Sequence, residues 1–295
     1  MMIDDEFDWV DRSEYPFKSR YLETPSGVIH YIDEGAGDVI LFLHGNPTWS
    51  FMYRHIIRCL RADYRCVALD YIGFGLSDKP DDVSYLPQFH AENVKLLIDL
   101  LDLRDVTLVM HDWGGPIGMS YALDYPNNVK ALIVFNSFCW SVKGMKWVER
   151  FAFVMGSSFG EFMCRNFNVL PRFAIAPVFG DKTRFTPSIR QHYIKPFPTR
   201  DSRKGTWMFA RAALGQKAWL DGLWSRRAVL DKTPIRTIWG LRDIALTVRE
   251  RDRWKAEFPI HSSHDFPQIG HFVPEEAGSE AIEPIKAFLR DLPDN

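Results

Sequence analysis

Short runs of consecutive apolar residues alternate along the chain with stretches in which apolar residues recur every three or four positions. The runs have the length of strands that are buried on both faces of a sheet, and the spaced stretches are typical of amphipathic helices. This alternation predicts a mostly parallel sheet with helices on both faces. The predicted strands are 19–22, 28–33, 39–43, 65–69, 106–110, 129–135, 235–239 and 262–266, and the main predicted helices are 51–60, 86–103, 116–125, 248–258 and 278–289.

The alternation stops between residues 137 and 227. This segment has no strand pattern, and it holds 11 of the 22 Phe and five of the 10 Trp at helical spacings broken by Pro and Gly. We therefore predict an α/β core formed by residues 1–136 and 228–295, with residues 137–227 inserted as a helical cap. Because open α/β sheets bind ligands at the carboxyl ends of their strands, we expect the cap to cover that edge.

Composition excludes several function classes. There are 36 Lys plus Arg against 38 Asp plus Glu, so no basic surplus points to nucleic acid. The acidic N-terminus lacks the apolar segment of a signal peptide, and no run of 18 apolar residues predicts a membrane span. The four Cys form no C-x-x-C pair, which favours free thiols in a cytoplasmic protein. With neither a metal-ligand spacing nor a phosphate loop, no metal or cofactor is expected.

Asp112 lies between a predicted buried strand and a predicted helix, and Gly114 and Gly115 follow it. A sharp strand–turn–helix bend that exposes a nucleophile needs small neighbours, which these glycines provide. Met110 occupies a position that is usually small in such bends. The turn by itself is equally compatible with Asp112 acting only as a helix N-cap.

Two late loops supply partners for such a nucleophile. His271 follows the last predicted strand, and Asp243 follows the strand at 235–239, so the chain order is nucleophile, acid, His. Asp243 would hold the His271 imidazole in one tautomer. The corresponding position after the strand at 129–135 carries Asn136 and Ser137, which cannot serve as an acid. Past the strand at 39–43, the backbone N–H of Asn46, together with that of Trp113, would form an oxyanion hole.

Three segments together resemble the haloalkane dehalogenases of the α/β-hydrolase superfamily. They are His44-Gly45-Asn46-Pro47-Thr48-Trp49-Ser50, Asp70-Tyr71-Ile72-Gly73-Phe74-Gly75-Leu76-Ser77-Asp78-Lys79-Pro80 and His111-Asp112-Trp113-Gly114-Gly115. The similarity covers about 19–136 and 228–290, whereas the cap is similar only in position and helical character. The resemblance implies an α/β-hydrolase fold and an enzyme that needs no cofactor. Its substrates would be small apolar halogenated compounds and water, and a halide ion would be released.

The resemblance also implies roles for individual residues. Asp112 would be the nucleophile that forms an alkyl ester, His271 the general base and Asp243 the acid that orients it. The side chains of Asn46 and Trp113 would donate hydrogen bonds to the halide. The combination is similar to the third subfamily, because the branch with a Glu after the strand at 129–135 is excluded by Asn136. That subfamily tends to self-associate, which implies a homo-oligomer.

Other activities remain as alternatives. An epoxide hydrolase shares the fold and the Asp nucleophile, but the resemblance implies two cap tyrosines, and 137–227 holds only Tyr193. A fluoroacetate dehalogenase would place an Arg near the bend where Trp113 stands, and a serine esterase would need a Ser at position 112. A non-catalytic ligand-binding protein of the same fold commonly lacks a triad member, whereas all three positions are filled here.

The cap aromatics are expected mainly to pack the cap onto the core. Phe138, Trp140 and Phe173 are predicted to line the substrate pocket. The basic residues between 184 and 211 are interpreted as a solvated face rather than an anion site.

Overall fold

A computed structural model describes residues 7–293 of the chain. Its centre is an eight-stranded sheet with the order β1-β2-β4-β3-β5-β6-β7-β8. The strands are β1 Arg20–Thr24, β2 Gly27–Glu34, β3 Val39–Leu43, β4 Arg65–Leu69, β5 Val106–Asp112, β6 Val129–Ser137, β7 Ile235–Gly240 and β8 His261–Phe266. β3 to β8 pair in parallel, while β1 and β2 form an antiparallel hairpin whose second strand lies against β4.

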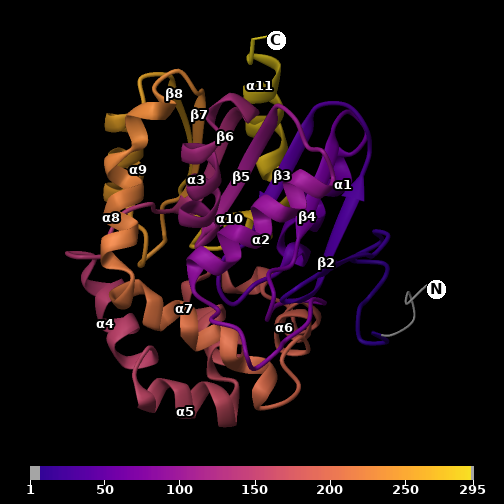
Figure 1. The fold of residues 1–295 in the computed structure, drawn as a ribbon, viewed down its shortest axis with the longest axis vertical. Helices are drawn as coiled ribbons and strands as arrows, with labels where there is room; N and C mark the ends of the chain where they lie inside the picture. The colour runs from indigo at the N-terminus through magenta and orange to yellow at the C-terminus, as the bar shows by residue number, and fades with distance from the viewer. Residues whose placement is uncertain (1–6, 294–295) are drawn as a thin grey trace.

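The continuous apolar runs are explained by burial on both faces of the sheet. Along β5, Leu108 and Met110 face one hydrophobic cluster and Val109 faces the other. Helices α2 Pro87–Leu100, α3 Gly114–Asp124 and α9 Val248–Glu257 cover the first face, and α1 Arg54–Leu60, α10 Val273–Glu276 and α11 Ile282–Arg290 cover the second. The predicted α/β-hydrolase sheet with flanking helices is thus present (Figure 1).

Residues 138–234, which we call the cap segment, connect β6 to β7. Within this segment the structure contains helices and no strand. The main helices are α4 Lys146–Met155, α5 Ser158–Phe167, a short π-helix η3 Leu170–Ala174, α6 Pro187–Ile194, α7 Lys204–Gly215 and α8 Lys217–Ser225. The cap helices α4 to α7 gather at one end of the sheet, and α11 lies at the opposite end (Figure 1).

Two strands are longer than predicted at the end that faces the cap. β5 continues to Asp112 and β6 to Ser137, and the last pairing between them is shifted in register. In the opposite direction, the helix predicted over 86–103 ends at Leu100, because the chain turns at Asp102 with a positive φ. Within the described residues, no helix is long and apolar enough to cross a membrane.

Candidate active site

Asp112 stands at a sharp bend between β5 and α3. Its φ is +49°, a left-handed conformation that is uncommon for a residue with a side chain. A Cβ on Gly114 would lie 2.1 Å from the Leu43 carbonyl oxygen, and one on Gly115 would lie 2.0 Å from Ser137 Oγ. The two glycines therefore allow the close approach that the sequence pattern indicated. Met110 is tolerated before the bend because it packs against Gly118, where a Cβ would lie 2.5 Å from its sulfur.

The backbone around Asp112 holds its carboxylate. The Asn46 N–H donates to Asp112 Oδ2 at 2.9 Å, and the Trp113 N–H also bonds to this carboxylate. Burial raises the pKa of Asp112, and His271 together with these N–H groups opposes the rise. The two N–H groups that the sequence predicted for an oxyanion hole thus converge on one side chain.

His271 is paired with Asp243. His271 Nδ1–H donates to Asp243 Oδ2 at 2.7 Å, which leaves Nε2 as the acceptor nitrogen of the neutral ring. Asp243 Oδ1 accepts from the N–H groups of Ala245 and Leu246 at 2.7 and 3.1 Å. Burial lowers the pKa of His271, but the charge of Asp243 and its hydrogen bond outweigh this, so the pKa is raised. The predicted acid and base are therefore in direct contact.

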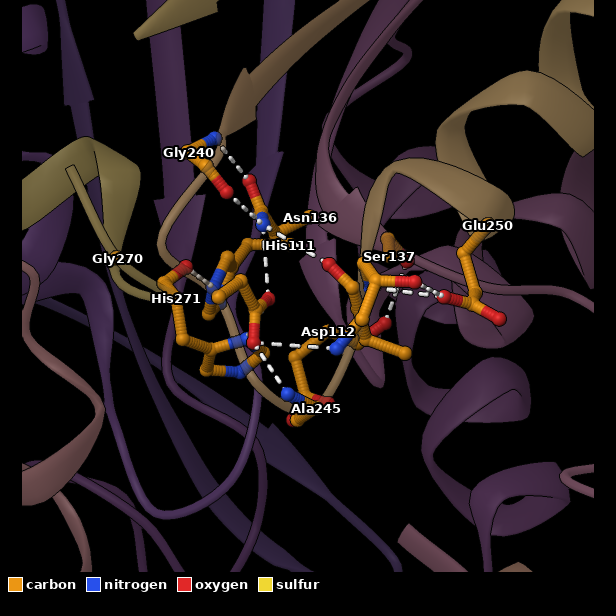
Figure 2. Close-up of polar contacts among 12 residues, drawn as sticks. His111, Asp112, Asn136, Ser137, Gly240, Ala245, Glu250, Gly270 and His271 are labelled. Carbon is orange, nitrogen blue, oxygen red and sulfur yellow. Dashed lines mark hydrogen bonds and ion pairs between the residues drawn. The ribbon is translucent and has the colours of Figure 1, made fainter. Parts of the chain in front are cut away.

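Asn136 is a component of the site that the sequence reasoning dismissed. It lies near the end of β6 with a φ of +25°, and its Nδ2 donates to Asp243 Oδ2 at 2.8 Å. Its Oδ1 accepts from the Gly240 N–H at 2.8 Å, so Asn136 also ties β6 to the end of β7 (Figure 2). Its position at a strand end could have indicated Asn136, because that edge of the sheet brings a hydrogen-bond donor as close to Asp243 as it would bring an acid to His271.

The main chain of His271 is clamped from two directions. Its N–H donates to the Val178 carbonyl of the cap segment at 2.9 Å. Its carbonyl accepts from His111 Nε2 at 2.9 Å, a contact that Figure 2 shows. The buried carboxylate of Glu276 accepts from Gly270 N–H and Gly180 N–H at 2.9 and 3.0 Å. These contacts join the loop that carries His271 to the cap segment, and the sequence patterns had given no role to His111 or Glu276.

The two predicted halide donors differ in how free they are. Asn46 Nδ2 donates to the Thr206 carbonyl of α7 at 3.0 Å, and Asn46 Oδ1 is buried without a partner among the described residues. No hydrogen bond of Trp113 Nε1 is found within residues 7–293, and the ring packs edge-on against Phe138. Within the described residues the Trp113 indole N–H is therefore free, whereas the Asn46 amide is partly committed to the cap segment.

Asp112, His271, Asn46 and Trp113 open into one cavity with about 740 Å³ of empty space including its mouth. Its other walls are mostly apolar side chains from the cap segment and the strand ends, Phe138 among them. Trp140 instead packs against Trp224 and Trp254, remote from the lining. Phe173 is 60% exposed on the outside of η3. The predictions for these two residues were wrong, because the sequence indicates neither where the loop after β6 directs Trp140 nor which side of η3 turns inward.

Tyr193 is not part of this cavity. It is fully buried, and its hydroxyl donates to Glu275 of α10 in a cluster with Arg54 of α1. The lining residues include no tyrosine. Among residues 7–293 there is also no group of three or more His, Cys, Asp or Glu that could hold a metal ion.

A carboxylate at a strand–helix bend, a His–Asp pair and two converging N–H groups, all at the carboxyl edge of this sheet, define an α/β hydrolase. The alpha/beta hydrolase fold family matches residues 38–277, and the chain belongs to that family.

Several known proteins are similar over most of their length. Haloalkane dehalogenase 2 of Mycobacterium tuberculosis (strain ATCC 25618 / H37Rv) is 36% identical over 272 residues, which covers 90% of this chain and 93% of the relative. A cis-3-alkyl-4-alkyloxetan-2-one decarboxylase of Shewanella oneidensis is 32% identical and covers 94% and 89%. The crystal structure of the haloalkane dehalogenase DatA from Agrobacterium tumefaciens C58 has a TM-score of 0.84 at 29% identity and covers 94% and 97%. The expected resemblance to haloalkane dehalogenases is confirmed.

Proposed function

We propose that the protein hydrolyses haloalkanes to an alcohol and a halide through a covalent alkyl ester on Asp112. The observation that carries the proposal is one apolar cavity into which Asp112, the Trp113 indole and His271 all open. Relatives named haloalkane dehalogenases, at up to 36% identity over most of the chain, support it.

The first step is displacement at an sp³ carbon. A carboxylate oxygen of Asp112 attacks the carbon in line with the carbon–halogen bond, a C–O bond forms, and the halide leaves with the bonding electron pair. Trp113 Nε1–H and the remaining Asn46 Nδ2–H stabilise the charge that develops on the halide, as donors do in an oxyanion hole. Apolar walls suit the substrate and strengthen these hydrogen bonds by excluding water.

The second step is hydrolysis of the ester. His271 accepts a proton from water, the oxygen of that water attacks the carboxyl carbon of Asp112, and the alcohol leaves with the proton. The N–H groups of Asn46 and Trp113, which bond to the Asp112 carboxylate, stabilise the oxyanion. Asp243 orients His271 and stabilises its cationic form. The carboxylate is then restored.

A second candidate is decarboxylation of a cis-3,4-dialkyl oxetan-2-one, favoured by the relative of that name that is similar over 94% of this chain. The same attack by Asp112 at the ring carbon C4 would break the C4–O bond and release a tethered carboxylate instead of a halide. Loss of CO₂ would then form the C3–C4 double bond and return the electron pair to Asp112. This route consumes no water and needs no general base, so it would not require His271 to accept a proton.

Two further alternatives are less well supported. Opening of an epoxide needs an acid beside the leaving oxygen, and the cavity lining contains no tyrosine. A non-catalytic role would not explain why Asp112 and His271 line one cavity while Asp243 holds His271.

The test compares the wild type with His271→Gln and Asp112→Ala. With 1-iodobutane, the wild type should release iodide continuously. His271→Gln should release about one iodide per protein and retain a butyl group on the peptide that contains Asp112. Asp112→Ala should do neither. Absence of both iodide and adduct in the wild type would refute dehalogenation.

The same variants separate the alternatives. Alkene and CO₂ from a cis-dialkyl oxetanone in both the wild type and His271→Gln, without iodide release, would establish the decarboxylase. Diol from styrene oxide would instead identify an epoxide hydrolase.

A further inference from the structure

Charge is divided unequally between the cap segment and the rest of the chain. Residues 138–234 hold 17 Lys plus Arg against six Asp plus Glu, whereas the other residues hold 19 against 32. The near-neutral total therefore conceals a net charge of +11 on the cap segment and −13 elsewhere. Such a dipolar distribution orients a protein in the field of a charged surface.

The outer helices of the cap segment also expose large apolar side chains. Phe153 on α4 is 74% exposed, and Phe159 and Phe162 on one side of α5 are 61% and 55% exposed. Phe167 at the end of α5 and Phe173 on η3 are exposed to a similar degree. Exposed aromatic rings concentrated in this way mark a site of interaction.

Cations are interleaved with these rings. Lys146 and Arg150 share the outward side of α4 with Phe153 and Val154 at helical spacing, and both are exposed. Neither forms an ion pair with another described residue. Arg172, beside Phe173, is likewise exposed. The outward surface of α4, α5 and η3, which we call the aromatic-basic face, thus combines apolar and cationic side chains.

The aromatic-basic face adjoins the cavity. The inner side of α4 supplies Val148, Phe151 and Ala152 to the cavity wall, and Trp147 belongs to the wall while remaining 39% exposed. On η3, Ala174 lines the cavity next to the outward-facing Phe173. In Figure 1, α4 and α5 form the end of the molecule farthest from the C-terminus.

We propose that the aromatic-basic face binds the surface of an anionic phospholipid bilayer, so that apolar substrate dissolved in the membrane reaches the cavity beside α4. Aromatic and cationic side chains on one amphipathic surface are what a headgroup interface binds. A two-fold contact of this face with its own copy would place Lys146 and Arg150 of both chains together, which the repulsion of like charges opposes. The proposal replaces the expectation, drawn from the absence of a long apolar run, that the protein has no membrane partner.

The test is co-sedimentation of the full chain with vesicles, which needs no substrate and is independent of the proposed function. We expect binding to vesicles of equal parts phosphatidylglycerol and phosphatidylcholine, weakened by salt, and little binding to phosphatidylcholine alone. Lys146→Glu/Arg150→Glu should weaken binding by about 30-fold or more, from the loss of two surface cations. Phe159→Ser/Phe162→Ser should weaken it by about tenfold or more.

Matched variants at exposed positions of the core provide the controls. Arg104→Glu/Lys255→Glu makes the same change of charge, and Leu100→Ser/Ile260→Ser removes the same kind of apolar exposure. Both controls should bind vesicles like the wild type. Equal losses in controls and cap variants, or no binding of the wild type at low salt, would overturn the proposal. Self-association through this face would also overturn it. In that case the wild type would form an assembly in analytical ultracentrifugation and would not bind vesicles, and Phe159→Ser/Phe162→Ser would dissociate the assembly.

Discussion

Asn136 Nδ2 and His271 Nδ1 donate to the same oxygen, Oδ2 of Asp243, at 2.8 and 2.7 Å. The amide thus restricts the Asp243 carboxylate to the position in which it accepts from His271. Because Asn136 bonds to Gly240 as well, it ties the end of β6, which pairs with the end of β5 at Asp112, to the end of β7 just before Asp243.

Replacing Asn136 by Leu should therefore slow ester hydrolysis more than ester formation. The loss of buried hydrogen bonds costs about 1–3 kcal/mol, so we expect turnover to fall about tenfold or more while the first-turnover burst of iodide persists. Stopped-flow iodide release checks both phases. Asn128→Ala, just before the opposite end of β6, should lower stability without changing the ratio of burst to turnover, and an equal effect of both variants on that ratio would contradict the role of Asn136.

Turnover should rise with pH on the acid side. His271 must be neutral to accept a proton from water, and its pKa is raised above 6.5 by Asp243, so protonation below that raised pKa removes the base. Removing the negative charge in Asp243→Asn lowers the pKa of His271 and should move the acid limb of kcat to lower pH, with a lower plateau. A kcat–pH profile measured with 1-iodobutane checks the direction, and a limb that stays in place would exclude His271 as the titrating base.

The two halide donors should contribute unequally. Trp113→Phe keeps the ring but removes the indole N–H, and we expect the burst to slow on the order of 10²-fold. Asn46→Ala should slow it less, since the Asn46 amide is shared with the Thr206 carbonyl, but it should also loosen the contact with α7. The measurement is the burst rate with bromide and iodide substrates. A larger effect for Asn46→Ala would reverse this assignment.

Gly45 has no room for a side chain beside Asp112. A Cβ there would lie 2.5 Å from Asp112 Cβ and 2.6 Å from Oδ2. Gly45→Ala should therefore displace the carboxylate and abolish most of the burst, on the order of 10²-fold for a shift of about 1 Å. Gly222→Ala in α8 meets open space and should preserve the burst while raising stability by about 0.5–1 kcal/mol in thermal unfolding.

The sequence predicted the sheet well because its buried strands carry uninterrupted apolar runs, and it predicted Asp112, Asp243 and His271 as strand-end residues that the fold would bring to one edge. The contact between Asp243 and His271 follows from that topology. The commitment of the Asn46 amide to Thr206 could not be foreseen, because it depends on how a cap helix from 160 residues further on packs over the strand ends. The prediction of the pocket wall was wrong for a similar reason, since the loop that carries Trp140 and the short helix that carries Phe173 have orientations that no sequence periodicity specifies.

Under the proposed chemistry, the backbone contact with Asp112 gives the two carboxylate oxygens different fates. Oδ2 is held by the Asn46 N–H, so the other oxygen attacks the substrate and leaves within the alcohol, and an oxygen atom from water replaces it. The oxygen atom of each alcohol molecule therefore comes from the Asp112 carboxylate, and the oxygen that replaces it in the carboxylate comes from water. One atom of the side chain is renewed at every turnover, while the atom beside it stays for the lifetime of the molecule.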